Sequence, residues 1–197
     1  MAEISIHLCI LAAGAGTRFG SVKQIQTFNK QPMLMHVHNQ IDHPLIVKKS
    51  IVVGAHYERV IQAIPSNTDV IEAQDWQIGL SASIAAAVDA MSHNATHLML
   101  ALADQPLIQF ADYDRLISAC LNSPENITAA FYASRCGVPA IFPSADLILL
   151  RQLKGDKGAG KLLNTMENVI PVNIPNAVND IDTPEDLNRI ERQFKAL

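Results

Sequence analysis

The sequence has few cysteines, few aromatic residues and little net charge, and each shortage argues against a class of protein. Its three cysteines are far apart and form no CxxC pair, so we expect neither a disulfide framework nor a zinc site. This cysteine usage predicts a reducing compartment, the cytoplasm. A net charge of −4 provides no basic footprint for nucleic acid. No apolar run approaches the roughly 20 residues of a membrane helix, and no basic segment precedes the first one. We therefore expect no membrane association and no signal peptide.

The composition favours one globular α/β domain over residues 1–197. Hydrophobic residues make up 49% of the chain and charged residues 17%, which indicates a large core rather than disorder. Aromatic residues make up only 5%, whereas Ala, Ile and Leu are abundant, and this balance suits an α/β protein better than an all-β protein.

Strand-like and helix-like segments alternate along the first two thirds of the sequence. Alternation of this kind predicts βαβ crossovers and a mostly parallel sheet, with ligands bound beyond the carboxyl ends of the strands. We predict strands at 4–11, 50–53, 69–72, 97–102 and 127–131, and helices at 33–41, 57–64, 81–91 and 110–121.

The last third is less regular. We predict an edge strand at 138–142 because Pro139 near its start cannot donate to a central ladder. A helix at 145–153 and short strands at 169–174 and 177–181 follow. Thr183 is a favourable N-cap and Pro184 suits the first helical position, so a terminal helix should run from there to about residue 195.

A glycine loop carrying two cations follows the first strand. Residues 11–23 read LAAGAGTRFGSVK, in which Gly14, Gly16 and Gly20 free the backbone so that successive N–H groups can turn toward an anion. Arg18 and Lys23 add positive charge to the same loop. We expect a nucleoside triphosphate to bind here.

Other interpretations of the glycine-rich segments are weaker. A dinucleotide fingerprint requires G-x-G-x-x-G, but Phe19 stands at the third position. The loop could also be a turn that binds nothing. Residues 155–162, GDKGAGKL, nearly match a P-loop, but Leu162 replaces the hydroxyl that binds Mg²⁺. We interpret this second cluster as a mobile loop that closes over a second substrate.

LAAGAGTRFGSVKQ resembles the signature of nucleotidyltransferases of the molybdenum cofactor cytidylyltransferase (MobA/MocA-like) type. Three departures concern Phe19, where Met is common, Ala103, where the family usually has glycine, and Gly160–Lys161, where Ala-Arg is common. Four later segments strengthen the resemblance in order and spacing: GLSASIAAAV at 79–88, LADQPLI at 102–108, GVPAIFP at 137–143 followed by LKGDKGAGKLL, and NDIDTPEDL at 179–187.

The resemblance implies a Rossmann-like three-layer sandwich and Mg²⁺-dependent transfer of CMP from CTP to molybdopterin, with release of pyrophosphate. Two alternatives keep the same chemistry: another acceptor, such as a sugar phosphate or methylerythritol phosphate, or GTP as donor. A third alternative is a non-catalytic nucleotide-binding accessory protein that inserts or protects the cofactor in a client molybdoenzyme.

Carboxylates at the strand ends are the expected metal ligands, because Mg²⁺ typically takes one or two carboxylates together with phosphate oxygens. Asp104 and Asp182 are the candidates, with Asp180 as a rival to Asp182 and with turn formation or helix capping as structural alternatives. Arg18, Lys23 and Asp104 are the expected catalytic residues. The expected nucleotide-binding residues are Leu11, Ala12, Ala13, Gly14, Gly16, Thr17, Arg18, Lys23, and the helix-start serines Ser81 and Ser83, one of which could simply be an N-cap.

Overall fold

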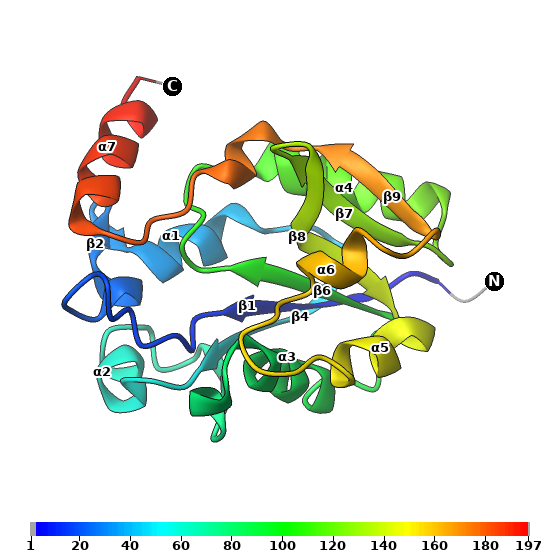
Figure 1. The fold of residues 1–197 in the computed structure, drawn as a ribbon, viewed down its shortest axis with the longest axis horizontal. Helices are drawn as coiled ribbons and strands as arrows, with labels where there is room; N and C mark the ends of the chain where they lie inside the picture. The colour runs from blue at the N-terminus through cyan, green and yellow to red at the C-terminus, as the bar shows by residue number, and fades with distance from the viewer. Residues whose placement is uncertain (1–2, 197) are drawn as a thin grey trace.

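The computed structural model describes residues 3–196 and is built around a seven-stranded sheet (Figure 1). The strand order is β5-β4-β1-β6-β8-β7-β9, and every neighbouring pair is parallel except the two pairs that involve β8. The strands are β1 (Ile6–Leu11), β4 (Ile46–Val53), β5 (Asp69–Glu72), β6 (His97–Leu102), β7 (Ile127–Tyr132), β8 (Arg135–Pro143) and β9 (Val169–Asn173), and a separate hairpin pairs β2 (Thr27–Phe28) with β3 (Gln31–Pro32).

Helices cover both faces of the sheet and complete three layers, which confirms the predicted α/β Rossmann-like sandwich. β1 shows the reason, because Ile6, Leu8 and Ile10 pack into one apolar cluster while Cys9 and Leu11 pack into the other. The helices are α1 (Met33–Gln40), α2 (Tyr57–Gln62), α3 (Leu80–Asp89), α4 (Phe110–Asn122), α5 (Leu147–Arg151), α6 (Gly160–Leu163) and α7 (Pro184–Phe194).

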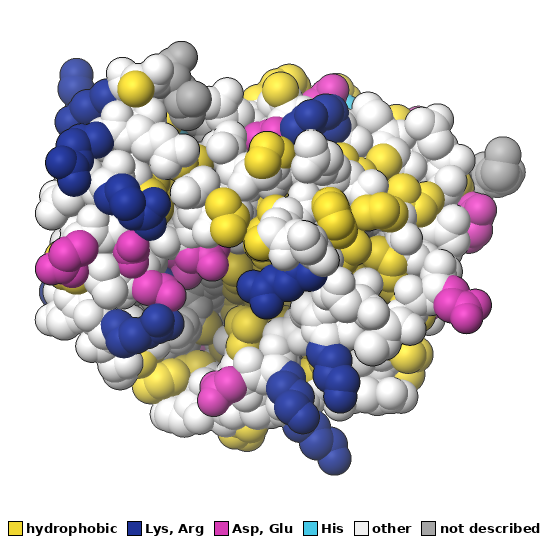
Figure 2. Space-filling model, turned by 45° about the horizontal axis from the view of Figure 1, so that its top comes forward, with side chains coloured by type: hydrophobic (Ala, Val, Ile, Leu, Met, Phe, Trp, Pro, Cys, Tyr) yellow, Lys and Arg dark blue, Asp and Glu magenta, His cyan; other side chains and the backbone are white. Residues whose placement is uncertain are grey.

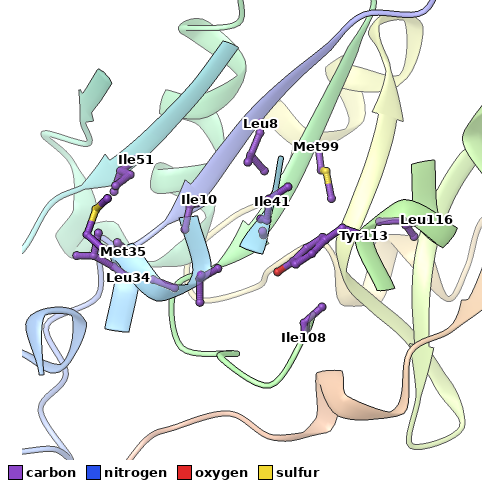
Figure 3. Close-up of a cluster of buried hydrophobic side chains, with 14 of the residues drawn as sticks. Leu8, Ile10, Leu34, Met35, Ile41, Ile51, Met99, Ile108, Tyr113 and Leu116 are labelled. Atoms are coloured by element: carbon purple, nitrogen blue, oxygen red, sulfur yellow. The ribbon is translucent and has the colours of Figure 1, made fainter. Parts of the chain in front are cut away.

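The larger core lies between the sheet and the helices α1 and α4 (Figure 3). In that view Leu34 and Met35 of α1 approach Ile51 of β4, and Tyr113 of α4 lies between Met99 and Ile108. A smaller cluster joins α7 to the glycine loop: Phe19, Phe28, Met33, Leu107, Ile181 and Ile190 are all buried in it. Figure 1 shows α7 at the edge of the molecule, beside α1 and β2.

Two predictions for the last third are wrong. The segment 138–142 belongs to a central strand, since β8 lies between β6 and β7. Pro139 is tolerated there because β8 pairs with β6 only from Ala140 onward, and the β7–β8 register shifts between Ala129 and Ala130. Residues 177–181 form no strand: a 3₁₀ helix covers Pro175–Val178, and the Ile181 N–H bonds to the Asp104 carbonyl instead of a ladder partner.

Two helix starts bear on the sequence predictions, and one of them requires a correction. Thr183 caps α7 as predicted, and its hydroxyl accepts a hydrogen bond from the Asp186 backbone N–H in a capping box. α3 is capped by Gly79 and not by a serine; Gly79 has φ +119°, a conformation that favours glycine. Within residues 3–196, no helix has the length and hydropathy that crossing a membrane requires.

Candidate functional site

The glycine loop is anchored to the sheet by backbone and side-chain hydrogen bonds. The Ala12 N–H donates to the Val52 carbonyl at 2.8 Å as the chain leaves β1. The buried Gln24 side chain then turns back, and its Nε2 donates to the carbonyls of Ala12 (2.9 Å) and Gly14 (2.5 Å). Gly16 adopts φ +60°, which glycine accommodates without strain. Because these contacts take up carbonyl groups, the loop keeps an open, defined shape.

Lys23 connects the loop to two distant aspartates. Its Nζ lies 2.7 Å from Asp104 Oδ2 and 3.1 Å from Asp182 Oδ1, and its side chain is only 12% exposed. Burial alone would lower the pKa of Lys23, but the Asp104 and Asp182 carboxylates outweigh it and raise the pKa above its ordinary value. The more exposed Arg18 guanidinium contacts the other oxygen of Asp182 at 2.9 Å. Four side chains predicted from the sequence therefore meet at the carboxyl edge of the sheet.

Asp104 retains an unused oxygen at this junction. Oδ2 pairs with Lys23, whereas Oδ1 is buried and has no hydrogen-bond partner in the described part of the chain. A buried carboxylate oxygen without a partner is costly unless a cation or donor satisfies it. Asp104 and Asp182 therefore fit a hard divalent cation, which prefers oxygen ligands.

Asp182 rather than Asp180 contacts the positively charged side chains of Arg18 and Lys23. Burial, followed by repulsion from the Asp104 carboxylate, raises the pKa of Asp180 to about 6. The structure thus brings Asp104 and Asp182 together and leaves Asp180 beside them.

Three connected hollows run along this edge. The first, about 210 Å³, lies between the glycine loop and Arg18, Lys23 and Asp182. The second, about 200 Å³, is lined by loop residues 11–16 together with Lys23, Gln24 and Asp104. The third, about 590 Å³, shares Leu11, Leu80 and Leu102 with the second and extends to Tyr132, Arg135 and Lys161. Figure 2 shows the hollowed face, with hydrophobic side chains inside the hollow and charged side chains around it.

The structure brings most of the predicted nucleotide-binding residues to these hollows, but not the two serines. Leu11, Ala12, Ala13, Gly14, Gly16, Thr17, Arg18 and Lys23 line the first two. Ser81 and Ser83 are buried, and Leu80 faces the cleft in their place. Ser81 instead lines a separate hollow beside Asp75 and Ala82, and its N–H donates to the Gly155 carbonyl at 3.0 Å.

The second glycine cluster borders the largest hollow. Gly158, Gly160 and Lys161 line it. The segment also packs closely on the start of α3, because a Cβ at Gly158 would lie 2.7 Å from Leu80 Cδ2. The loop thus borders the hollow beside the first glycine loop, and its closing over a second substrate stays a prediction.

Several residues of the cleft could not be identified from motifs. Asn164 joins α6 to β8, since its side chain donates to the Cys136 and Gly160 carbonyls and accepts from the Cys136 N–H. Tyr132 and Arg135 enter the cleft from either side of the β7–β8 turn. Gln24 is the last residue of the signature LAAGAGTRFGSVKQ, but the motif assigns it no role, and the structure shows that its side chain shapes the loop.

Comparison with known families agrees with this geometry. The family model described as "MobA-like NTP transferase domain" matches residues 8–169. The chain belongs to this family. The matched range contains the glycine loop and Asp104, whereas Asp182 lies beyond its end. By family, this MobA-like domain is a nucleotidyltransferase domain, as the sequence resemblance predicted.

Curated relatives of the MobA-like domain differ in length and in name. The chain is 25% identical over 197 residues to "Purine catabolism protein PucB" of Bacillus subtilis, and the match covers 92% of this chain and 94% of that protein. It is 26% identical over 198 residues to "Nicotine blue oxidoreductase" of Paenarthrobacter nicotinovorans, covering 95% and 94%. It is 28% identical over 130 residues to "Bifunctional protein GlmU" of Bartonella bacilliformis, covering 64% of this chain but only 29% of that protein.

Solved structures share the fold over nearly the whole chain. A homologue of Mycobacterium tuberculosis Rv0371c from Mycobacterium sp. strain JC1 superposes with a TM-score of 0.85 at 23% identity, covering 97% of each chain. Molybdopterin-guanine dinucleotide biosynthesis protein A from Archaeoglobus fulgidus superposes with a TM-score of 0.69 at 16% identity, covering 97% and 100%. A manganese complex of Rv0371c has a TM-score of 0.73 at 25% identity, covering 95% and 98%.

Proposed function

We propose that the chain, as a single nucleotidyltransferase domain, transfers CMP from CTP to the phosphate of molybdopterin and releases pyrophosphate. The observation that carries this proposal is the position of Lys23 Nζ between Asp104 and Asp182 at the mouth of the glycine loop. Nucleotidyl transfer depends mainly on position and charge, and this junction supplies both.

Asp104 and Asp182 would hold Mg²⁺, and Asp104 Oδ1, which lacks a hydrogen-bond partner within residues 3–196, supports that assignment. When bound, the ion would neutralise phosphate charge and make the α-phosphorus more electrophilic. The manganese complex of Rv0371c, a structural relative, supports a divalent cation in this fold.

The chain's own residues would hold the triphosphate and stabilise the leaving group. The N–H groups of the loop containing Gly14 and Gly16 would donate to phosphate oxygens, and Arg18 would contact the departing pyrophosphate. Lys23 would lie nearer the α-phosphate as a point charge. An acceptor phosphate oxygen forms the new bond to the α-phosphorus while the bond to pyrophosphate breaks. No general base is required, because a phosphate monoester with a second pKa near 6 is already anionic.

The largest hollow suits the acceptor. Its volume of about 590 Å³ lies in the usual range for a small-molecule site, and its floor of Leu80, Leu102 and Val138 is apolar. Arg135 and Lys161 supply positive charge at its border. An acceptor with a ring system and a phosphate fits these features, which supports a pterin phosphate, whereas a sugar phosphate would leave the apolar floor uncovered.

The identity of the base rests on resemblance, and the experiment must decide it. A CTP-bound synthetase of CMP-2-keto-3-deoxy-manno-octonic acid shares this fold with a TM-score of 0.76. GTP is the alternative donor, because the Archaeoglobus structure is named for a guanine dinucleotide. The three free cysteines support a reducing compartment such as the cytoplasm.

Pyrophosphate release tests the proposal directly. The purified chain is incubated with Mg²⁺, each of the four nucleoside triphosphates, and molybdopterin, a sugar phosphate or methylerythritol phosphate. We expect release with CTP and molybdopterin. Turnover with GTP alone would reject the base assignment. Tight CTP binding without release over the whole acceptor panel would favour a non-catalytic role beside a client molybdoenzyme.

A further inference from the structure

Gln105 follows the proposed metal ligand Asp104 and is almost fully buried, with 1% of its surface exposed. Its Nε2 donates to the Ala177 carbonyl at 2.7 Å, in the 3₁₀ helix Pro175–Val178. The neighbouring Asp104 carbonyl accepts a hydrogen bond from the Ile181 N–H at 2.9 Å. Two consecutive residues at the end of β6 therefore hold the segment that leads to Asp182.

The Gln105 amide also lies beside two other residues of this edge. Its Oε1 is buried and makes no hydrogen bond among the described residues. Tyr132 and Asp180 lie beside the amide, and Tyr132 lines the largest hollow. Tyr132 is itself closely packed, since a Cβ at Gly137 would lie 2.4 Å from its hydroxyl oxygen. Gln105 thus donates to the segment that leads to Asp182 and lies beside Tyr132, a side chain that lines the largest hollow.

Burying an amide with one unsatisfied oxygen costs free energy that an apolar side chain of similar size would not. A purely structural contact between β6 and the 3₁₀ helix would not need that polar group. What the amide adds is direction, because a hydrogen bond fixes the relative position of the two backbone segments more narrowly than apolar packing does.

We infer that Gln105 is a positioning residue that sets the spacing of Asp104 and Asp182 and places Tyr132 against the acceptor. This inference rests on the proposed metal site, because it gives Gln105 no direct contact with substrate. Partners of this kind, which orient ligands without binding the ion, typically contribute about 10–100-fold to metal affinity or activity.

Manganese binding to the full chain tests this role without turnover. Free Mn²⁺ is titrated by electron paramagnetic resonance against wild type, Gln105→Met and Gln105→Asn, with Mn²⁺ alone and with Mn²⁺ plus CTP. Gln105→Met fills the space without a donor, and Gln105→Asn keeps the amide but shortens its reach. We expect both to bind Mn²⁺ about tenfold or more weakly, and any acceptor turnover to show a raised KM.

Ser50→Ala is the matched control. Ser50 is fully buried and hydrogen bonded to His7 at 2.7 Å, so the variant loses a buried polar contact away from the metal-ligand segment. It should melt at a lower temperature with unchanged Mn²⁺ affinity. Unchanged Mn²⁺ affinity in folded Gln105→Met would overturn the positioning role. Failure of both Gln105 variants to fold would assign Gln105 to the core alone and overturn it as well.

The two proposals fail in distinguishable ways. A wild type that binds Mn²⁺ but releases no pyrophosphate rejects the proposed function, and the ratio of affinities still decides the role of Gln105. A wild type that releases pyrophosphate while Gln105→Met binds Mn²⁺ normally keeps the function and rejects the positioning role. A wild type that binds no Mn²⁺ in either condition contradicts both.

Discussion

Replacing Lys23 with methionine should have opposite effects on metal binding and on catalysis. Methionine has a similar length but no charge, so it removes the ammonium that lies 2.7 Å from Asp104 and 3.1 Å from Asp182. Asp104 then has no cation beside it, and Asp182 keeps only its contact with the exposed Arg18. Asp104 Oδ1 is already buried and has no hydrogen-bond partner among the described residues. The change makes the metal-free protein less stable and gives a divalent ion a vacant, negatively charged site.

The structure sets the size of the effect. A hydrogen bond to a charged group contributes about 1.5–3 kcal/mol. The Lys23–Asp104 contact is mostly buried and deserves this value, whereas Asp182 is 34% exposed and solvent screens its contact. We expect the free energy of unfolding to fall by about 2 kcal/mol, which corresponds to roughly 4–8 °C in Tm for a chain of this size.

Added Mn²⁺ should reverse this loss. At about 100 times its dissociation constant, a ligand stabilises the folded state by about 2.7 kcal/mol. Because wild type must first displace the Lys23 ammonium, Mn²⁺ without nucleotide should raise the Tm of Lys23→Met more than that of wild type. Turnover should nevertheless fall on the order of 10²-fold or more, the scale for loss of one preorganised electrostatic donor.

Differential scanning calorimetry without and with Mn²⁺ measures the Tm and its response to the ion, and pyrophosphate release measures turnover. Lys49→Met is the control, because Lys49 pairs at 3.5 Å with the exposed Asp42, away from the cleft. That variant should change neither the response to Mn²⁺ nor turnover. A Lys23→Met protein whose Tm equals that of wild type and responds no more strongly to Mn²⁺ would refute the reasoning.

Three further predictions address the metal ligand, acid stability and the last helix. Asp104→Asn should abolish turnover and Mn²⁺ binding while far-UV circular dichroism stays native; full activity would contradict the ligand assignment. Burial, together with repulsion from Lys48, lowers the pKa of His7 from 6.5 to about 4. Between pH 6.5 and 4 the unfolded chain binds a proton at His7 that the folded chain does not bind. The free energy of unfolding should therefore fall by roughly 3 kcal/mol as the pH falls from 6.5 to 4. Urea unfolding over this range measures the fall, and His7→Gln should flatten the profile; an unchanged slope would show that other groups dominate. Thr183→Ala removes the cap of α7 and should lower the free energy of unfolding by about 1 kcal/mol in urea melts. An unchanged free energy of unfolding would show that other contacts hold the helix start.

The parts of the fold predicted well are those decided by local pattern. The strands His97–Leu102 and Asp69–Glu72 have the predicted bounds, because each is a short apolar or β-branched run between turn residues. The predictions failed where the structure of a segment depends on which strands lie beside it. Pro139 indicated an edge strand, yet β8 is central because a register shift accommodates the proline. Residues 177–181 had the hydrophobicity of a strand but found no neighbouring strand.

The residues of the cleft show the same difference between what local sequence predicts and what depends on distant contacts. Asp104 could be predicted because it lies just beyond the buried strand β6, where parallel sheets bind ligands. Lys23 could be predicted because it ends the glycine loop that follows β1. Gln105 lies in the segment LADQPLI, but the role that we infer for it could not be predicted, because it depends on a carbonyl 72 residues away. Ser81 and Ser83 were expected at the nucleotide because they open α3, but the φ +119° of Gly79 starts the helix one residue earlier and turns Leu80 toward the cleft.

The convergence of Asp104 and Asp182 on one divalent cation beside the glycine loop is tested most directly by a crystal structure with CTP and Mn²⁺. The anomalous difference map locates the manganese independently of any assumption about the nucleotide. We predict its strongest peak between the carboxylates of Asp104 and Asp182, with the triphosphate over Gly14–Gly16 and Lys23 displaced from the position that it holds between the two aspartates. A peak elsewhere, or a triphosphate outside the glycine loop, would contradict the proposed site.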